Sequence, residues 1–284
     1  MTTFEPLRAT ARPSDDGPIL IIGATGKTGR RVLAALTDAG ADVRPTSRSS
    51  PTYFDWTEPD SWAPALAGAR SAYVVPPDVP SDIERFVAEA EAAGLERLVL
   101  LSARQPEQGG DGVLLEVEAA VRQGALPTTV LRPSWFSQNF TEGLFVDELA
   151  EGVLRLPVGD GREPFVDTAD IAAVAVSALI GDGPHDATYD LSGPELLTFD
   201  DAVARLARVT GRELRFEPVE VDVWADAASA YLPAPVVELL MNLFTAIREG
   251  ANEYLSPGVQ QVLGRPARSF DDALSGAGLS ETTA

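Results

Sequence analysis

Short continuous apolar runs alternate with stretches of helical periodicity along the first half of the chain. Such runs are typical of strands buried on both faces of a sheet, and the stretches between them place apolar residues on one helical face. We predict strands at 19–22, 41–47, 53–56, 71–75, 97–101 and 128–132, and helices at 30–40, 57–68, 81–93 and 113–123. This regular alternation indicates an α/β fold built on a doubly wound parallel sheet.

The second half contains fewer strand signals and is mainly helical. We predict helices at 167–178, 198–210 and 235–250 and a last strand at 188–191. Thr198 and Asp201 have the spacing of a capping box, and Asp167 and Asp170 are interpreted as helix caps rather than catalysts. The apolar helix at 235–250 is interpreted as a core helix, with a pocket lid or a dimer surface as alternatives.

Glycines recur where the first strand gives way to the first helix. Backbone without side chains can bend sharply there and approach a ligand, and the free N–H groups of a helix start favour an anion. The string G-x-x-G-x-x-G also marks ordinary tight turns, but a strand before it and a helix after it are the context of a dinucleotide site. We therefore predict a Rossmann-type fold whose cofactor contacts include Gly23, Thr25, Gly26, Lys27, Thr28 and Gly29.

Arg48 follows the second strand, about 20 residues beyond the glycines. An acidic residue at this place binds the adenosine ribose of NAD, whereas an arginine suits the 2′-phosphate of NADP. We predict NADP(H) as the cofactor, with a solvated surface arginine as the alternative. Asp55, at the end of the third strand, is predicted to accept a hydrogen bond from adenine, and a capping role is its alternative.

Ligands of open α/β sheets bind beyond the carboxyl ends of the strands. Pro76 ends the fourth strand and is predicted to face the cofactor ribose and nicotinamide, and Ser102 ends the fifth strand. Beyond Pro133 the aromatic side chains of Trp135, Phe136 and Phe140 are expected either to line a substrate pocket or to pack in the core.

These assignments divide the chain into three parts. Residues 1–17 are polar and contain proline, and we expect a flexible leader there. Residues 18–150 form the nucleotide-binding domain, and residues 151–284 complete the sheet and form a smaller, mainly helical substrate lobe. One large domain with an appended lobe agrees with the length of 284 residues.

The charge of the chain bears on its partners. A net charge of −21, from 22 basic and 43 acidic residues, repels nucleic acid and anionic membrane surfaces. No apolar run reaches the length of a membrane helix, which takes about 18 residues or more. We expect a cytoplasmic protein, monomeric or homodimeric, that acts on a small molecule, and its acidity suits a cationic substrate.

Several kinds of catalytic chemistry are absent from the sequence. There is no cysteine, and the single histidine, His185, lies in a turn-forming stretch and is interpreted as a surface residue. Neither a metal site nor a serine triad can be assembled from these residues. Lys27 is the only lysine, so no tyrosine is followed by lysine four residues later, the proton-donor dyad that many enzymes of this fold use.

Five segments of the sequence form a set: the glycine turn 23–29, the position of Arg48, Phe54-Asp55-Trp56, Leu100-Leu101-Ser102-Ala103, and 126–133. Together they resemble the NmrA-like atypical short-chain dehydrogenases, and the resemblance runs from about Pro18 to Leu274. More narrowly, 193–198 and 245–250 resemble the ergot-alkaloid branch, the agroclavine and festuclavine dehydrogenases of secondary metabolism.

The resemblance implies an NADPH-dependent reductase, because that branch uses NADPH to reduce cyclic iminium ions. An iminium carbon accepts hydride without a proton donor, which agrees with the missing dyad. By the same resemblance, Pro76, Ser102 and Pro133 surround the nicotinamide, Ser102 is the catalytic candidate, and Trp135 and Phe136 wall the substrate. The expected acceptor is an iminium, an imine or an activated C=C bond. The alternative is a redox sensor without catalysis that binds NADP(H) and regulates a protein partner.

Overall fold

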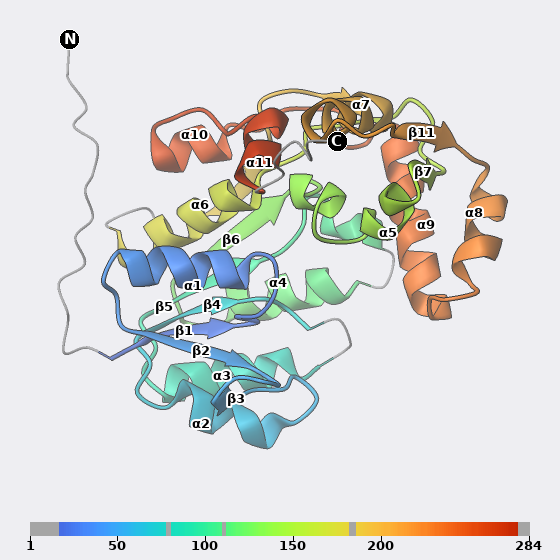
Figure 1. Cartoon of the computed structure of the whole chain (residues 1–284). Helices are drawn as coiled ribbons and strands as arrows, with labels where there is room; N and C mark the ends of the chain where they lie inside the picture. The colour runs from blue at the N-terminus through green and yellow to red at the C-terminus, as the bar shows by residue number, and fades with distance from the viewer. Residues whose placement is uncertain (1–16, 78–80, 110–111, 182–185, 278–284) are drawn as a thin grey trace, which may run out of the picture. The chain divides into compact units, whose positions relative to one another are not determined.

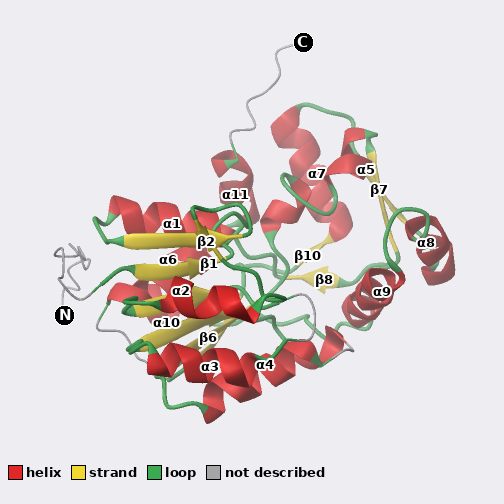
Figure 2. Cartoon of the chain, turned by 90° about the horizontal axis from the view of Figure 1, so that it is seen from below, coloured by secondary structure: helices red, strands yellow, loops and turns green. Residues whose placement is uncertain are grey.

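A computed structural model describes residues 17–77, 81–109, 112–181 and 186–277. The leader predicted at 1–17, apart from Gly17, and His185 lie outside these residues. The described chain forms a seven-stranded sheet and two small two-stranded sheets, with helices around them (Figures 1 and 2). None of the helices in the described part of the chain is long and apolar enough to cross a lipid bilayer.

The large sheet has the strand order β3-β2-β1-β4-β5-β6-β9. Its strands are β1 (Ile19–Ile22), β2 (Val43–Ser47), β3 (Thr52–Tyr53), β4 (Ser71–Val74), β5 (Arg97–Leu101), β6 (Thr128–Pro133) and β9 (Thr188–Leu191). The strand β1 pairs in parallel with β2 on one side and β4 on the other, with Ile19 opposite Val43 and Ser71. The order of the strands therefore reverses beside β1, the place where doubly wound sheets bind nucleotides.

Helices alternate with these strands along the chain, as the sequence pattern predicts. They are α1 (Gly29–Asp38), the 3-10 turn η1 (Pro59–Ser61), α2 (Trp62–Leu66), α3 (Ile83–Ala92), α4 (Val113–Gln123) and α6 (Thr168–Ile180). In both views α1 and α3 lie on opposite sides of the strands (Figures 1 and 2). The strands β1 and β4 are buried along their whole length, which explains their unbroken apolar runs.

The described residues divide by contact into two compact units, each assembled from separate stretches of chain. The first comprises the described residues within 1–101, 117–130 and 172–187, and the second comprises those within 102–116, 131–171 and 188–284. The sequence pattern had suggested consecutive parts, 18–150 and 151–284. The interleaving arises because the chain leaves each unit and returns to it twice.

The second unit contains the two long helices that the sequence predicts, α7 and α9, together with small elements that the sequence pattern did not reveal. They are η2 (Pro106–Gly109), η3 (Ser137–Phe140), α5 (Val146–Ala150), β7 (Val153–Leu156), β8 (Arg162–Glu163), β10 (Leu197–Thr198), α7 (Phe199–Thr210), β11 (Arg215–Pro218), α8 (Val221–Ala228), α9 (Ala234–Arg248), α10 (Gly258–Leu263) and α11 (Phe270–Gly276). The two expected long helices, α7 and α9, are confirmed, and Thr198 and Asp201 form the predicted capping box. The core of this unit is rich in aromatic side chains, among them Phe140, Phe145, Phe165, Phe199 and Phe244.

Candidate functional site

The predicted nucleotide turn connects β1 to α1 in the first unit. Gly23 has a φ of +79°, a conformation that favours glycine, and a Cβ added to it would lie 2.9 Å from Val75 Cβ. A Cβ on Gly29 would lie 2.2 Å from the carbonyl oxygen of Gly23, so the helix can begin this close to the strand only with glycine there. Thr25 and Gly26, between them, are exposed. The turn thus presents backbone to a ligand.

The second strand anchors this turn. The N–H groups of Gly23 and Ala24 both donate to the carbonyl oxygen of Thr46, each at a distance of 3.2 Å. The buried Thr46 hydroxyl donates to the carbonyl oxygen of Ile21 at 3.0 Å. Strand β2 therefore holds both the turn and, two residues further along, Arg48.

Three positively charged side chains gather at the start of α1. Burial lowers the pKa of Lys27, and the neighbouring charges of Arg30 and Arg31 lower it further. The Arg31 guanidinium also donates to the carbonyl oxygen of Lys27 at 2.9 Å. Mutual repulsion of cations beside a helix start is relieved by an anion, which the helix dipole also favours. The residues present here fit the phosphates of a dinucleotide.

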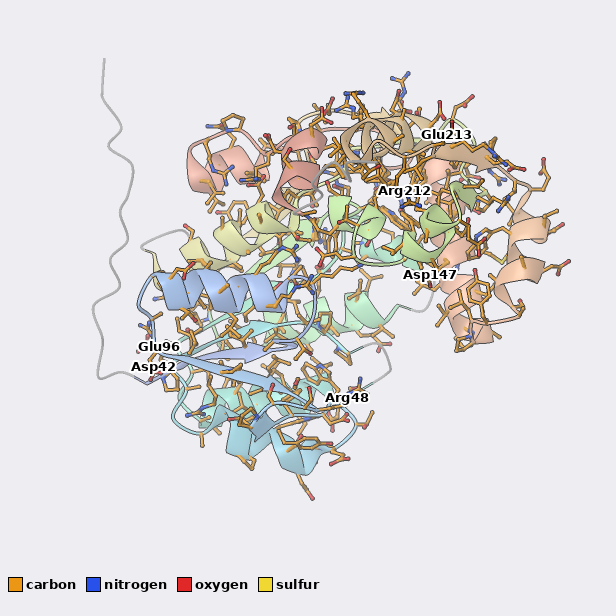
Figure 3. The ribbon with its side chains drawn as sticks, in the orientation of Figure 1. Asp42, Arg48, Glu96, Asp147, Arg212 and Glu213 are labelled. Carbon is orange, nitrogen blue, oxygen red and sulfur yellow. The ribbon has the colours of Figure 1, made fainter. Side chains whose placement is uncertain are left out.

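Arg48 lies at the carboxyl end of β2 and is exposed. Figure 3 places it at the opposite end of the strands from Asp42 and Glu96, which precede β2 and β5. Its charge is close enough to Asp55 to contribute to the lowered pKa of that carboxyl group. The guanidinium is thus on the ligand-binding edge of the sheet, where an arginine suits a 2′-phosphate.

Asp55 closes a tight turn. One of its carboxyl oxygens accepts the backbone N–H and the hydroxyl of Thr57, each at 2.8 Å. These two hydrogen bonds are the main reason that the pKa of Asp55 is lowered. Asp55 thus caps this turn and not the following 3-10 turn at 59–61, which begins after Glu58, and the contact of Asp55 with adenine stays a prediction.

The end of β4 is fixed by the segment that carries Asp55. The indole N–H of Trp56 donates to the carbonyl oxygen of Val75 at 3.2 Å. Val75 in turn lies against Gly23, and Pro76 follows it directly. One chain of contacts therefore joins Trp56, Val75 and the nucleotide turn within the first unit.

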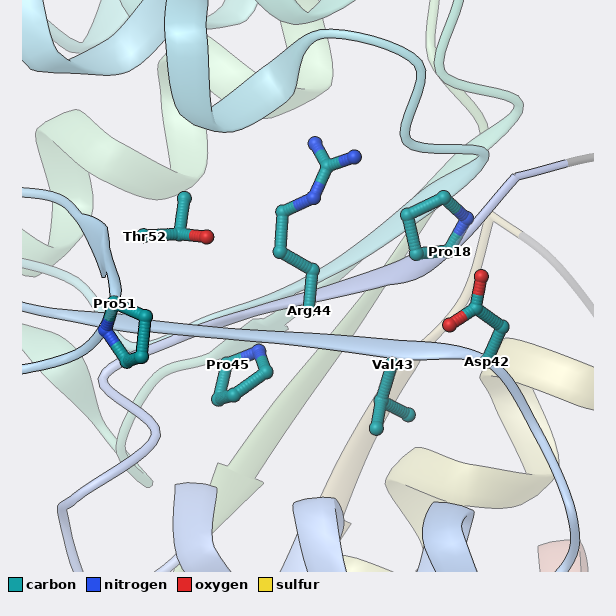
Figure 4. Close-up of a pocket in the computed structure, with 7 residues that line it drawn as sticks. All are labelled: Pro18, Asp42, Val43, Arg44, Pro45, Pro51 and Thr52. Carbon is teal, nitrogen blue, oxygen red and sulfur yellow. The ribbon is translucent and has the colours of Figure 1, made fainter.

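A surface hollow of about 370 Å³ lies elsewhere in the first unit, along the amino half of β2 (Figure 4). It is lined by Pro18, Asp42, Val43, Arg44, Pro45, Pro51 and Thr52. The Arg44 guanidinium donates to the carbonyl oxygens of Ala65 and Ala67. Because it ties down the end of α2, we assign this arginine a packing role.

The other predicted site residues belong to the second unit. Ser102 is buried just after β5, and its N–H donates to the carbonyl oxygen of Leu131 at 2.7 Å. Pro133 ends β6 and accepts the backbone N–H of Arg104 at 3.0 Å. Ser102 and Pro133 thus lie on neighbouring segments past the carboxyl ends of β5 and β6.

The three aromatic residues of the substrate prediction differ in their surroundings. Phe140 is only 2% exposed and packs among Phe145, Phe165, Phe199 and Phe270, so the core alternative describes its position. Trp135 is partly buried and stacks on Phe145 and Phe244, with ring centroids 6.0 and 5.6 Å away. Phe136 is also partly buried, and a contact of either residue with substrate stays a prediction.

Known proteins bear on the family and the fold. Residues 114–267 match the family model described as the NmrA-like family. The chain is 38% identical over 273 residues to (4-alkanoyl-5-oxo-2,5-dihydrofuran-3-yl)methyl phosphate reductase of Streptomyces griseus, covering 89% of this chain and 95% of that one. The chain belongs to the NmrA-like family. The predicted resemblance is thereby confirmed.

Two further similarities refine this assignment. Agroclavine dehydrogenase of Claviceps fusiformis is 34% identical over 278 residues, which cover 90% of this chain and 96% of that one, so the predicted branch is among the relatives. The crystal structure of triphenylmethane reductase of Citrobacter sp. with NADP(H) matches with a TM-score of 0.71 at 22% identity, over 92% and 99% of the two chains. The family relationship makes this NmrA-like protein an oxidoreductase, and the predicted Rossmann-type fold is confirmed.

Three buried residues of the second unit had no place in the sequence prediction. Arg104 follows Ser102 by two positions, at a strand end where ligand-binding residues are common, and this spacing could have drawn attention to it. Glu163 and Asn252 give no comparable signal, because each is isolated in a loop-rich stretch of sequence.

Proposed function

We propose that this protein is an NADP(H)-dependent reductase that transfers hydride to an iminium, an imine or an activated C=C bond of a small organic substrate. The observation that carries the proposal is the glycine turn with its cations, Lys27 at the helix start and Arg48 at the end of β2. The bound cofactor supplies the hydride. Backbone of the turn would hold its pyrophosphate, Lys27 would neutralise phosphate charge, and Arg48 would receive the 2′-phosphate.

The acceptor class is inferred from the absence of a proton-donating dyad. Lys27 is the only lysine of the chain and lies in the nucleotide turn, so it cannot serve a catalytic tyrosine beyond β5 or β6. A ketone develops an alkoxide that needs a proton donor, whereas an iminium carbon is already electrophilic. Relatives of this chain include agroclavine dehydrogenase and a reductase named for a dihydrofuranone that bears a phosphate. We expect the reduced bond to be polarised before hydride arrives.

Replacing Arg48 tests the cofactor. Arg48→Ala should weaken NADPH binding about tenfold or more, because a charge-assisted hydrogen bond to phosphate is lost, and should change NADH binding less than about twofold. Fluorescence titration of both nucleotides measures the two affinities. Arg85→Ala, which removes an exposed arginine of the same unit, is the matched control and should leave both unchanged. Equal losses for the two nucleotides in Arg48→Ala would remove Arg48 from the 2′-phosphate.

The reaction itself is tested by following NADPH oxidation with cyclic imines, enones and quinones. We expect turnover with at least one cyclic imine or enone. Tight NADPH binding with no oxidation across this set would contradict the reductase proposal and favour a sensor of NADP(H) that regulates a protein partner.

A further inference from the structure

Arg104, Glu163 and Asn252 form a buried polar cluster in the second unit. They come from three distant segments, the loop after β5, the strand β8 and the loop after α9. Their relative exposures are 4%, 0% and 5%. Four of their polar atoms have no hydrogen-bond partner among the described residues: Arg104 Nε, both carboxyl oxygens of Glu163 and Asn252 Oδ1. Such buried atoms are rare in folded proteins and call for a physical reason.

Arg104 is fixed by the loop that follows α9. Its guanidinium donates to the carbonyl oxygen of Tyr254 at 2.8 Å and to the Ser256 hydroxyl at 3.0 Å. It also lies over the Tyr254 ring, 4.3 Å from the centroid. Both terminal nitrogens of the guanidinium thus have hydrogen-bond partners, and Nε is the nitrogen that has none among the described residues.

Glu163 is an acid held in a neutral form. Burial raises its pKa to about 8. The Asn252 amide, the charge of Arg104 and the backbone N–H of Trp135 lower this pKa, but by less than burial raises it. Neither the Arg104 guanidinium nor the Asn252 amide makes a hydrogen bond with the carboxyl group of Glu163. At neutral pH the cluster therefore has carboxyl and amide acceptors, a carboxyl O–H and a guanidinium N–H.

The cluster lies on the side of the fold where ligands bind. Arg104 follows β5, and its backbone N–H donates to Pro133 at the end of β6. Ser256, which Arg104 contacts, donates to the carbonyl oxygen of Asp190 near the end of β9, at 2.7 Å. Arg104, in the loop after β5, is thus bonded directly to the end of β6 and through Ser256 to β9. Open α/β sheets receive their substrates at the carboxyl ends of such strands.

We propose that Arg104, Glu163 and Asn252 bind a neutral polar group of the substrate in which an N–H donor stands beside a carbonyl acceptor, as in an imide or a lactam. The N–H would meet the carboxyl and amide oxygens, and the carbonyl oxygen would meet Arg104 Nε. A cation is disfavoured here because the positive charge of Arg104 would repel it. This inference rests on the proposed reductase function and specifies its substrate.

Maleimide and N-methylmaleimide form a pair of probes that differ in the N–H alone. Each has an activated C=C bond, which takes hydride from NADPH on one carbon and a proton from water on the other, giving the succinimide and NADP⁺. The chain contains no cysteine that maleimides would alkylate. We expect the wild-type KM for maleimide to be about tenfold below that for N-methylmaleimide, because the methylated probe leaves buried acceptors unpaired.

Variants of Glu163 distinguish recognition from packing. Glu163→Leu should erase the difference between the two probes, whereas Glu163→Gln, which keeps a donor and an acceptor, should retain most of it. Glu238→Leu, which alters an exposed glutamate of α9, is the control and should retain all of it. A purely structural role for Glu163 would leave the ratio of the two KM values unchanged in Glu163→Leu, and that result would overturn the inference.

Binding of the reaction products provides a readout without turnover. Calorimetry in the presence of NADP⁺ should show succinimide bound about tenfold more tightly than N-methylsuccinimide by the wild type and equally by Glu163→Leu. Equal or absent binding of the two succinimides by the wild type would overturn the inference. Oxidation of NADPH with a cyclic imine would still support the proposed reductase function in that case. The reductase function itself would be contradicted only if no compound of the substrate set led to NADPH oxidation.

Discussion

The buried carboxyl group of Glu163 makes the stability of the fold depend on pH. Its pKa is about 8 in the folded protein and near the usual 4.5 in the unfolded chain. Between these values the folded state binds more protons than the unfolded state, so the free energy of unfolding falls as pH rises. The stabilising contribution of the neutral acid is complete below about pH 4.5 and is lost as pH rises through about 8.

A comparison of the wild type with Glu163→Gln isolates this effect from the many other carboxylates. The glutamine side chain has a similar shape and cannot ionise, so the variant should become increasingly more stable than the wild type between pH 5 and about 8. Urea unfolding at several pH values measures the difference. A constant difference across this range would mean that Glu163 keeps an ordinary pKa in the folded protein.

Single residues were predictable where the backbone dictates them. Gly23 and Gly29 follow from the strand-turn-helix context, and Arg48 follows from its distance along the chain. Glu163 and Asn252 could not be found in this way, because their partners lie at distant positions that only the folded chain brings together. Phe140 lies in the aromatic core, which is one of the two positions that the sequence leaves open for it, and its contact with substrate stays a prediction.

The β1–α1 turn shows how close packing of backbone restricts an element. A Cβ on Gly29 would overlap the carbonyl group of Gly23, whereas a Cβ on Gly26 would come no closer than 3.3 Å to it. Both glycines have the same sequence context in the motif. The structure nevertheless indicates that Gly26 can accept a larger side chain more readily than Gly29 can.

Substituting each of these glycines by alanine tests the difference. Gly29→Ala should lower the free energy of unfolding by about 1–3 kcal/mol, the usual cost of forcing extra atoms into packed structure. Gly26→Ala should change it by less than about 1 kcal/mol, since the neighbouring carbonyl needs to move by only a few tenths of an ångström. Urea denaturation of the two variants gives both values, and equal losses would contradict the geometric account.

Strands and helices with strong periodicity were predicted nearly to the residue. Strands β5 and β9 and helix α4 have the predicted bounds, and α7 begins one residue after its predicted start, because Thr198 is its cap. The short strands β7, β8, β10 and β11 were missed, because two to four residues are too few to show a period. These short strands belong to the second unit, and β8 contains Glu163.

Contacts across long stretches of sequence hold the second unit together. Arg268 donates to the buried Asp167 and Arg265 donates to the buried Asp170, each at 2.7 Å. Asp167 also accepts the N–H of Ala169, so the predicted capping role is seen together with the ion pair. The segment before α11 is thereby fastened to the start of α6, about one hundred residues earlier in the chain.

Removing one of these arginines should therefore destabilise the protein more than removing a surface arginine. Arg268→Met leaves a carboxyl oxygen of Asp167 buried without its donor and should lower the free energy of unfolding by about 1–3 kcal/mol. Arg85→Met, which breaks the exposed pair with Glu89, should cost less than about 1 kcal/mol. Thermal and urea unfolding measure both losses. Similar small losses for the two variants would show that the segment before α11 contributes little to the stability of the fold.

The position of Lys27 makes the chain unusually simple to label. With no thiol and one side-chain amine, an amine-directed reagent meets a single internal target, and that target lies in the nucleotide turn. Its lowered pKa leaves a larger share of the amine unprotonated, and hence nucleophilic, than in an ordinary lysine. The same lysine that is proposed to neutralise cofactor phosphate is thus a chemical handle for following occupancy of the turn.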